Sequence, residues 1–90
     1  MVEYTVDLAG VKNKLLFHNK LVQVLPFPLY YGKNLDALYD VLVDAHPMWE
    51  ITFLNCQDAV ESMGDYMTNV WMTFTEAIDA GAAVRVVWKR

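Results

Sequence analysis

Residues 30–47 read YYGKNLDALYDVLVDAHP, and the pattern within them predicts the helix around which the rest of the fold is arranged. Asn34 is a favourable helix N-cap, and Asp36 puts a carboxylate in the positively polarised first turn. Pro47 interrupts the chain, so the helix ends near residues 44–45. Three leucines share one face of this helix and are expected to pack inward: Leu35, Leu38 and Leu42.

Further elements are predicted on both sides of this helix. Runs rich in β-branched and aromatic residues predict strands over residues 2–6, 48–54 and 83–88. Helical spacing of apolar residues predicts helices over residues 14–25, 58–63 and 66–80. Pro26 and Pro28 end the first of these helices, and Gly64 and Gly81 end the other two. The buried face of the first helix is assigned to Leu15, Leu21, Val22 and Leu25.

The order of these elements predicts the fold class. Helices separate all three strands, and a helical crossover favours a parallel, right-handed connection between the strands that it joins. The two later strands are apolar nearly throughout, which is typical of strands covered on both faces. The sequence therefore predicts an α/β fold in which a three-stranded parallel sheet is packed with about four helices. At this length we expect a single domain over residues 1–90.

Composition is that of a globular protein, because 56% of the residues are hydrophobic and only 20% are charged. No apolar run approaches the roughly 18 residues of a membrane span, and no secretory leader is visible. Cys56 is the only cysteine, so it has no partner for an internal disulfide. These features predict a cytoplasmic protein that does not bind membranes.

Charge is distributed unevenly along the chain, which has a net charge of −4. No Lys or Arg lies between Asn34 and Val84, whereas nine carboxylates lie there. Because nucleic-acid binding depends on Lys and Arg, this segment is not expected to bind nucleic acid directly. It suits a basic protein partner instead, although carboxylates that only maintain solubility are an equal alternative on charge alone.

The residues that enzymes use are not arranged in a known pattern. His18 and His46 have no metal-ligand spacing with each other or with Cys56. Ser62 and Cys56 lie in no nucleophile motif, and the four glycines form no phosphate-binding loop. His18 is interpreted as a surface or half-buried helix residue. We therefore expect no catalytic residue, no metal and no cofactor.

The helix that follows Asn34 has an unusual outward face. At 100° per residue, one stripe opposite the leucines holds Asp36, Tyr39, Asp40 and Val43, with Asp44 at its edge. Like charges four residues apart destabilise a helix by about 0.2–0.5 kcal/mol, so folding alone does not favour this pattern. Aromatic residues among carboxylates are typical of interface hot spots, whereas a merely solvated face leaves Tyr39 and Val43 unexplained. Two carboxylates supply too few oxygens for a calcium site.

Residues 30–40, YYGKNLDALYD, resemble the central motif of the barstar family, whose members are intracellular inhibitors of a secreted bacterial ribonuclease. The resemblance extends over the whole chain, and residues 74–77 are similar to the family's acidic position in its last long helix. It implies a three-stranded parallel sheet with helices, and an inhibitor that places its second helix and the preceding loop in the nuclease active site. Lys33 and Tyr39 depart from the family pattern, which has an acidic residue and a tryptophan there.

The resemblance also implies roles for individual residues. Asp40 would occupy the place of a substrate phosphate, Asp36 and Glu76 would meet further basic residues, and the tyrosines would pack on the nuclease surface. The full expected partner-binding set is Tyr30, Asn34, Asp36, Tyr39, Asp40, Val43, Asp44 and Glu76. The expected partner is a basic bacterial ribonuclease of the barnase type, or a related nuclease toxin, bound 1:1.

Two other functions stay open at the level of sequence. The chain can be an acidic, barstar-like module that binds a different toxin or a basic protein that is not a nuclease. It can also be a small enzyme or a metal-binding protein, although no constellation of residues supports that function.

Overall fold

Three parallel strands form the sheet, in the order β1-β2-β3: β1 (Val2–Asp7), β2 (Trp49–Leu54) and β3 (Val84–Trp88). The computed structural model describes all 90 residues. Four helices complete the fold: α1 (Lys14–Val24), α2 (Leu35–Val43), α3 (Cys56–Met63) and α4 (Asp65–Asp79). The predicted α/β architecture, with a three-stranded parallel sheet and four helices, is confirmed.

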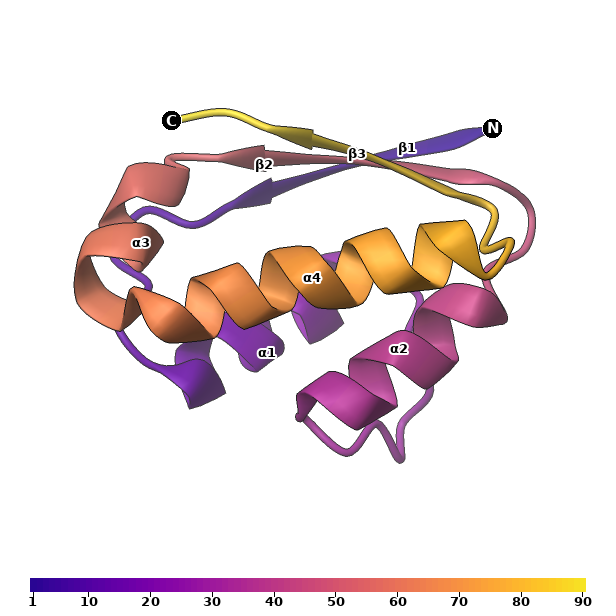
Figure 1. Ribbon diagram of the computed structural model, residues 1–90, viewed down its shortest axis with the longest axis horizontal. Coiled ribbons are helices and arrows are strands. Elements are labelled where there is room, and N and C mark those ends of the chain that lie inside the picture. The colour runs from indigo at the N-terminus through magenta and orange to yellow at the C-terminus, as the bar shows by residue number, and fades with distance from the viewer.

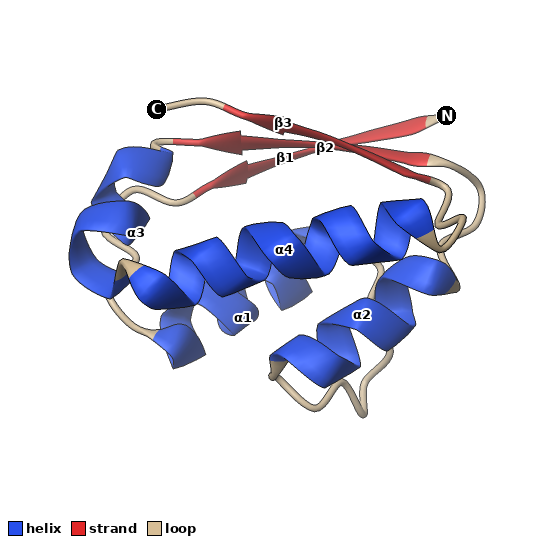
Figure 2. Ribbon diagram, viewed as in Figure 1, coloured by secondary structure: helices blue, strands red, loops and turns tan.

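The helices lie on one side of the sheet and leave its other face open (Figure 1, Figure 2). Along β2, buried residues on the helix side alternate with half-buried Glu50, Thr52 and Leu54 on the open face. Arg85 of β3 lies 3.7 Å from Glu50 on this face. The interpretation that the later strands are covered on both faces was therefore wrong. Residues such as Thr52 and Val87 reflect the preference of β-branched side chains for strands rather than a second covering layer.

Aromatic rings fill the space between the sheet and the helices. Phe53 of β2 stacks on Trp88 at 4.4 Å between ring centroids, and Phe74 of α4 meets Phe53 edge-on at 5.7 Å. Phe17 of α1 is stacked relative to Phe53 at a larger centroid distance, 6.4 Å. These rings belong to one continuous hydrophobic core that joins the strands to α1, α2 and α4.

The expected buried face of α1 is correct for Leu21 and Leu25, which are buried, and wrong for Leu15 and Val22. Phe17, His18 and Leu21 are buried, whereas Leu15 is 59% exposed and Val22 is 40% exposed. Apolar residues surround this helix almost completely, so their periodicity did not determine which side would meet the sheet. His18 is fully buried rather than on the surface, because hydroxyl groups from distant parts of the chain satisfy both of its ring nitrogens.

The end of α4 follows the predicted glycine stop. Gly81 adopts φ = +97°, in the left-handed region that glycine enters without a steric penalty. The Gly81 N–H donates to the Ile78 carbonyl, and the Ala82 N–H donates to the Ala77 carbonyl. This is the Schellman arrangement, and it directs the chain into β3. No helix in the structure combines the length and the apolar character needed to cross a membrane.

Candidate functional site

α2 is held at its N-terminus and along its inner face as the sequence predicts. The Asn34 side-chain oxygen accepts a hydrogen bond from the Ala37 N–H at 2.8 Å, which makes Asn34 the N-cap. Leu38 and Leu42 are fully buried, Leu35 is half-buried, and the helix packs against α4. The orientation of its outward residues is therefore determined by burial on the opposite side.

The outward face of α2 matches the predicted stripe with one adjustment. Asp36, Asp40, Val43 and Asp44 are exposed. Tyr39 is half-buried and packs against the hydrophobic core. Part of the Tyr39 ring therefore supports the helix, while the rest remains accessible to a partner.

Two helices together form what we call the acidic pocket, a depression of about 350 Å³ between α2 and α4. Its lining residues are Leu35, Asp36, Tyr39, Asp40, Thr73 and Glu76. Glu76 comes from α4, so the fold brings this carboxylate beside those of Asp36 and Asp40 from a position 36 residues further along the chain than Asp40. The acidic pocket therefore gathers three carboxylates and one phenol from two helices.

A second depression, which we call the loop pocket, adjoins the first and has a volume of about 720 Å³. It is lined by Pro26, Pro28, Tyr30, Asp40, Val41, Val43, Asp44, His46 and Trp49. Tyr30 is 89% exposed at its rim. Because Asp40 lines both pockets, the structure brings together every member of the expected partner-binding set except Asn34.

The carboxylates of both pockets have no ion-pair partner within 4.0 Å. The only ion pair within 4.0 Å joins Arg85 and Glu50 on the open face of the sheet. Ionised carboxylates act only as hydrogen-bond acceptors, and they bind guanidinium, ammonium or imidazolium groups most strongly. The site can therefore recognise an arrangement of positive charges on another molecule.

A buried cluster lies directly behind the loop that carries Tyr30. The Tyr31 hydroxyl lies 2.7 Å from Nδ1 of His18, and the Tyr66 hydroxyl lies 2.6 Å from Nε2. Burial, together with a smaller contribution from the nearby charge of Lys33, lowers the pKa of His18 to about 4. Burial also raises the pKa of both tyrosines. A neutral imidazole and two neutral phenols thus join the loop to α1 and α4.

The loop reaches α2 through a tight turn. Lys33 adopts φ = +53°, a left-handed conformation that is uncommon for a residue with a side chain. The side-chain amide of Asn34 donates to the Gly32 carbonyl at 3.3 Å, in addition to capping the helix. Both polar ends of Asn34 are therefore engaged within the turn, and its visible role is to orient the loop relative to α2.

The structure adds residues that sequence reasoning missed. Leu29 is fully exposed next to Tyr30, so the loop presents two adjacent apolar side chains to solvent. His46 lines the loop pocket, and Thr73 lines the acidic pocket while its hydroxyl donates to the Asn69 carbonyl at 2.8 Å. Pro28 was the available signal for Leu29, because proline favours turns: Leu29 and Tyr30 lie in a turn that a hydrogen bond from the Tyr31 N–H to the Pro28 carbonyl closes at 3.0 Å.

Neither a metal site nor a reactive thiol accompanies these pockets. No group of three or more His, Cys, Asp or Glu side chains is arranged to hold a metal ion. Cys56 is buried, its thiol donates to the Phe53 carbonyl at 3.6 Å, and burial raises its pKa. The thiol is therefore held in its protonated, weakly nucleophilic form.

Comparison with known families shows the family of the chain. A search of curated proteins finds no match to the chain. The family model described as Barstar (barnase inhibitor) matches residues 1–89. The match covers all three strands, all four helices and both pockets. The chain therefore belongs to the barstar family.

Proposed function

We propose that this protein inhibits a ribonuclease of the barnase type by covering its basic active site with α2 and the preceding loop. One observation carries the proposal: Asp36, Asp40 and Glu76 meet at the acidic pocket with no Lys or Arg within 4.0 Å. A ribonuclease active site carries positive charge because it binds phosphate. Complementary charges favour the correct partner and suppress others.

Asp40 has the central role in this proposal. It lines both pockets, so cationic side chains can approach its carboxylate from either side. There it would occupy the position of a substrate phosphate, accepting hydrogen bonds from arginine and histidine of the nuclease. Asp36 and Glu76 would meet neighbouring basic residues, while Tyr30 and Tyr39 would supply rigid apolar area around them. Asn34, Val43 and Asp44 complete the proposed contact set at its rim.

Packing and hydrogen bonds hold the framework of the site without a partner. Leu38 and Leu42 anchor the buried face of α2 in the core, and the Tyr31–His18–Tyr66 cluster holds the loop. Because little conformational freedom remains to be lost, such a surface can bind with a small entropic cost. The proposed inhibition is occlusion, with no chemical step and no metal.

The direct test titrates the purified protein into a barnase-type ribonuclease while RNA hydrolysis is followed. We expect complete inhibition at a 1:1 ratio, unchanged by a chelator. Asp40→Asn should weaken inhibition strongly, because it keeps the shape of the side chain and removes its charge. Asp79→Asn serves as a matched control, because Asp79 is exposed at the end of α4 outside both pockets.

Other outcomes would redirect the assignment. Binding without inhibition would identify an acidic module for another basic protein, and RNA binding or cleavage by this protein alone would overturn the proposal. Association kinetics add a second measurement. Steering by the carboxylates predicts association about tenfold slower at high salt than at low salt, with little change in dissociation.

A further inference from the structure

β3 is an edge strand with one unpaired side. It pairs only with β2, and the Lys89 N–H donates to the Phe53 carbonyl at 2.8 Å at the end of that ladder. Backbone groups alternate sides along a strand, so the N–H and C=O groups of Val84, Val86 and Trp88 are directed to the open edge. A row of unpaired backbone groups of this kind is a template for another strand.

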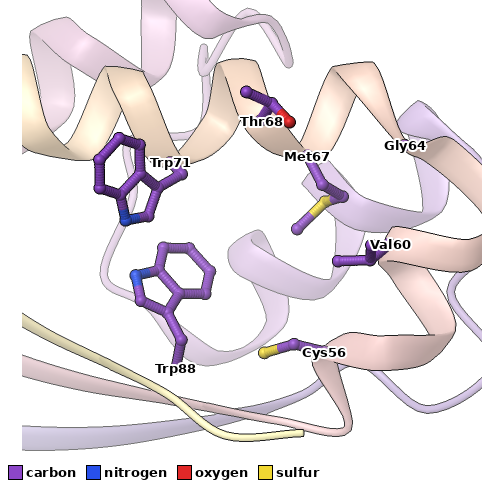
Figure 3. Close-up of a pocket in the computed structure, with 7 residues that line it drawn as sticks. All are labelled: Cys56, Val60, Gly64, Met67, Thr68, Trp71 and Trp88. Atoms are coloured by element: carbon purple, nitrogen blue, oxygen red, sulfur yellow. The ribbon is translucent and has the colours of Figure 1, made fainter.

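An apolar depression adjoins the end of this open edge (Figure 3). We call it the tryptophan pocket; its volume is about 360 Å³, and it lies between α3, α4 and β3. In Figure 3 the rings of Trp71 and Trp88 lie next to one another at one end, with Met67 and Val60 at the other. Trp71 is 53% exposed, an unusual condition for so large an apolar side chain. The pocket thus has room for a single side chain placed beside Trp88.

Charge distinguishes this edge from the opposite edge of the sheet. The open face of β3 carries Arg85, and Lys89 and Arg90 follow the strand. The Arg85 side chain is 67% exposed and only weakly paired at 3.7 Å, so it is available to a partner. β1, at the other edge, carries Glu3 and Asp7. An acidic segment is therefore attracted to β3 and repelled by β1.

We propose that β3 binds an extended acidic segment of a partner protein as a fourth strand, with one apolar side chain in the tryptophan pocket. Side chains of an added strand alternate between faces. Those on the open face would meet Arg85 and Lys89, and those on the helix side would lie beside Val86 and Trp88. The recognised sequence therefore alternates carboxylates with apolar residues, and an aromatic residue suits the pocket.

This surface is separate from the acidic pocket. The tryptophan pocket shares no lining residue with the acidic pocket or the loop pocket. It lies at the carboxyl ends of the strands, near Trp88 and Cys56, whereas the loop pocket includes Trp49 at the amino end of β2. The protein therefore has room for an acidic segment at β3 while its own carboxylates bind a basic partner. The inference does not depend on the identity of that basic partner.

The experiment uses the end-blocked peptide Glu-Val-Glu-Phe-Glu-Val-Glu as the probe. Calorimetry measures its affinity, and amide resonances of the labelled full chain locate the binding site. We expect saturable binding with shifts at Val84, Val86, Trp88 and the indole N–H of Trp71. Two control peptides isolate strand pairing: Glu-Glu-Val-Phe-Val-Glu-Glu has the same composition without the alternation, and an N-methylated probe keeps the side chains but removes backbone donors. Each should bind at least fivefold more weakly.

Two variants separate the pocket from the charge. Trp71→Ala removes an exposed wall of the pocket and should weaken the probe at least fivefold, while inhibition of the ribonuclease stays unchanged. Arg85→Glu should weaken the probe and remove most of its salt dependence. The proposal is wrong if the probe does not bind at millimolar concentration or if the control peptides bind equally well, which would indicate a pocket for small apolar molecules. Self-association through β3, measured by light scattering, would also overturn it by making a second copy the occupant.

Discussion

Tyr30 and Tyr31 are neighbours in the chain but belong to opposite kinds of surface. Tyr30 is 89% exposed beside the loop pocket, whereas Tyr31 is 7% exposed and its hydroxyl contacts His18. Around Tyr30, carboxylates have no ion-pair partner within the chain. Around Tyr31, every buried side-chain nitrogen and oxygen has a hydrogen-bond partner.

The two regions have opposite roles in the proposed binding site. The outward surface leaves its charges unpaired, so their interaction energy remains available to a partner. In the inward cluster every buried polar side-chain group has a hydrogen-bond partner, because an unpaired polar group in the core would cost about 1–3 kcal/mol of stability. Changes on the outer side should therefore alter binding, and changes on the inner side should alter stability.

The largest expected effect comes from Asp40→Ala. Binding to the ribonuclease should weaken by about 2–5 kcal/mol, because basic groups of the nuclease would be buried without a counter-charge; the range is taken from measured complexes that include the barnase–barstar pair. Stability should stay level or rise by about 0.2–0.5 kcal/mol, since two like-charge contacts with Asp36 and Asp44 disappear. Calorimetry and a denaturant titration measure the two effects. A variant that unfolds easily but binds normally when folded would make Asp40 structural and break the comparison.

Acid should act on the inner cluster. The pKa of His18 falls from 6.5 to about 4 on folding, so between these values the unfolded chain binds a proton that the folded protein excludes. Its contribution to stability is complete above pH 6.5 and is lost as pH falls toward 4, by about 3 kcal/mol. Unfolding measured across this range should show the slope, and His18→Phe should flatten it. An unchanged slope in that variant would remove His18 as its source.

A separate acid effect is expected at lower pH. The side chain of Asn55 and the Ala9 N–H lower the pKa of Asp7 below its usual 3.8. A carboxylate with a lowered pKa stabilises the fold above its unfolded pKa, and that contribution is lost as pH falls through the folded value. The His18 and Asp7 effects therefore occupy different pH ranges and can be read from one titration.

The two tyrosines offer a matched pair of substitutions. Tyr31→Phe removes the hydroxyl that satisfies Nδ1 of His18 and should cost about 1–3 kcal/mol of stability. Tyr30→Phe should change stability by less than about 0.5 kcal/mol, because its ring is in solvent. Urea unfolding of both variants decides the point. Equal losses of unfolding free energy in the two variants would show that the difference in exposure does not determine how much each tyrosine contributes to stability.

A smaller loss than that expected for Tyr31→Phe lies at the boundary between the two regions. Asn34→Ala should cost about 1 kcal/mol by removing the N-cap of α2, whereas Asn34→Ser should restore most of that stability. Measuring the affinity of both variants for the nuclease then shows whether Asn34 belongs to the outward surface or to the supporting framework. Restored binding in Asn34→Ser would show that Asn34 acts through the turn, and weak binding in that variant would show a direct contact with the nuclease.

Short-range patterns in the sequence determined much of this protein. The capping residue, the leucine spacing and Pro47 were sufficient to define α2 within one or two residues, because caps and periodicity act within a few turns. The carboxylate stripe and the motif at residues 30–40 followed from the same segment. Gly81 stopped α4 for an equally local reason, its tolerance of a positive φ.

Tertiary structure alone decided the features that depend on distant partners. α1 has apolar residues on nearly every side, so only packing selected Phe17 for the core in place of Leu15 and Val22. His18 is buried because Tyr31 and Tyr66 reach its two nitrogens, and neither distance can be read from local sequence. Glu76 joins Asp36 and Asp40 because α4 packs against α2. Periodicity reports which residues share a face, but the elements that meet that face are selected by the packing of the whole chain.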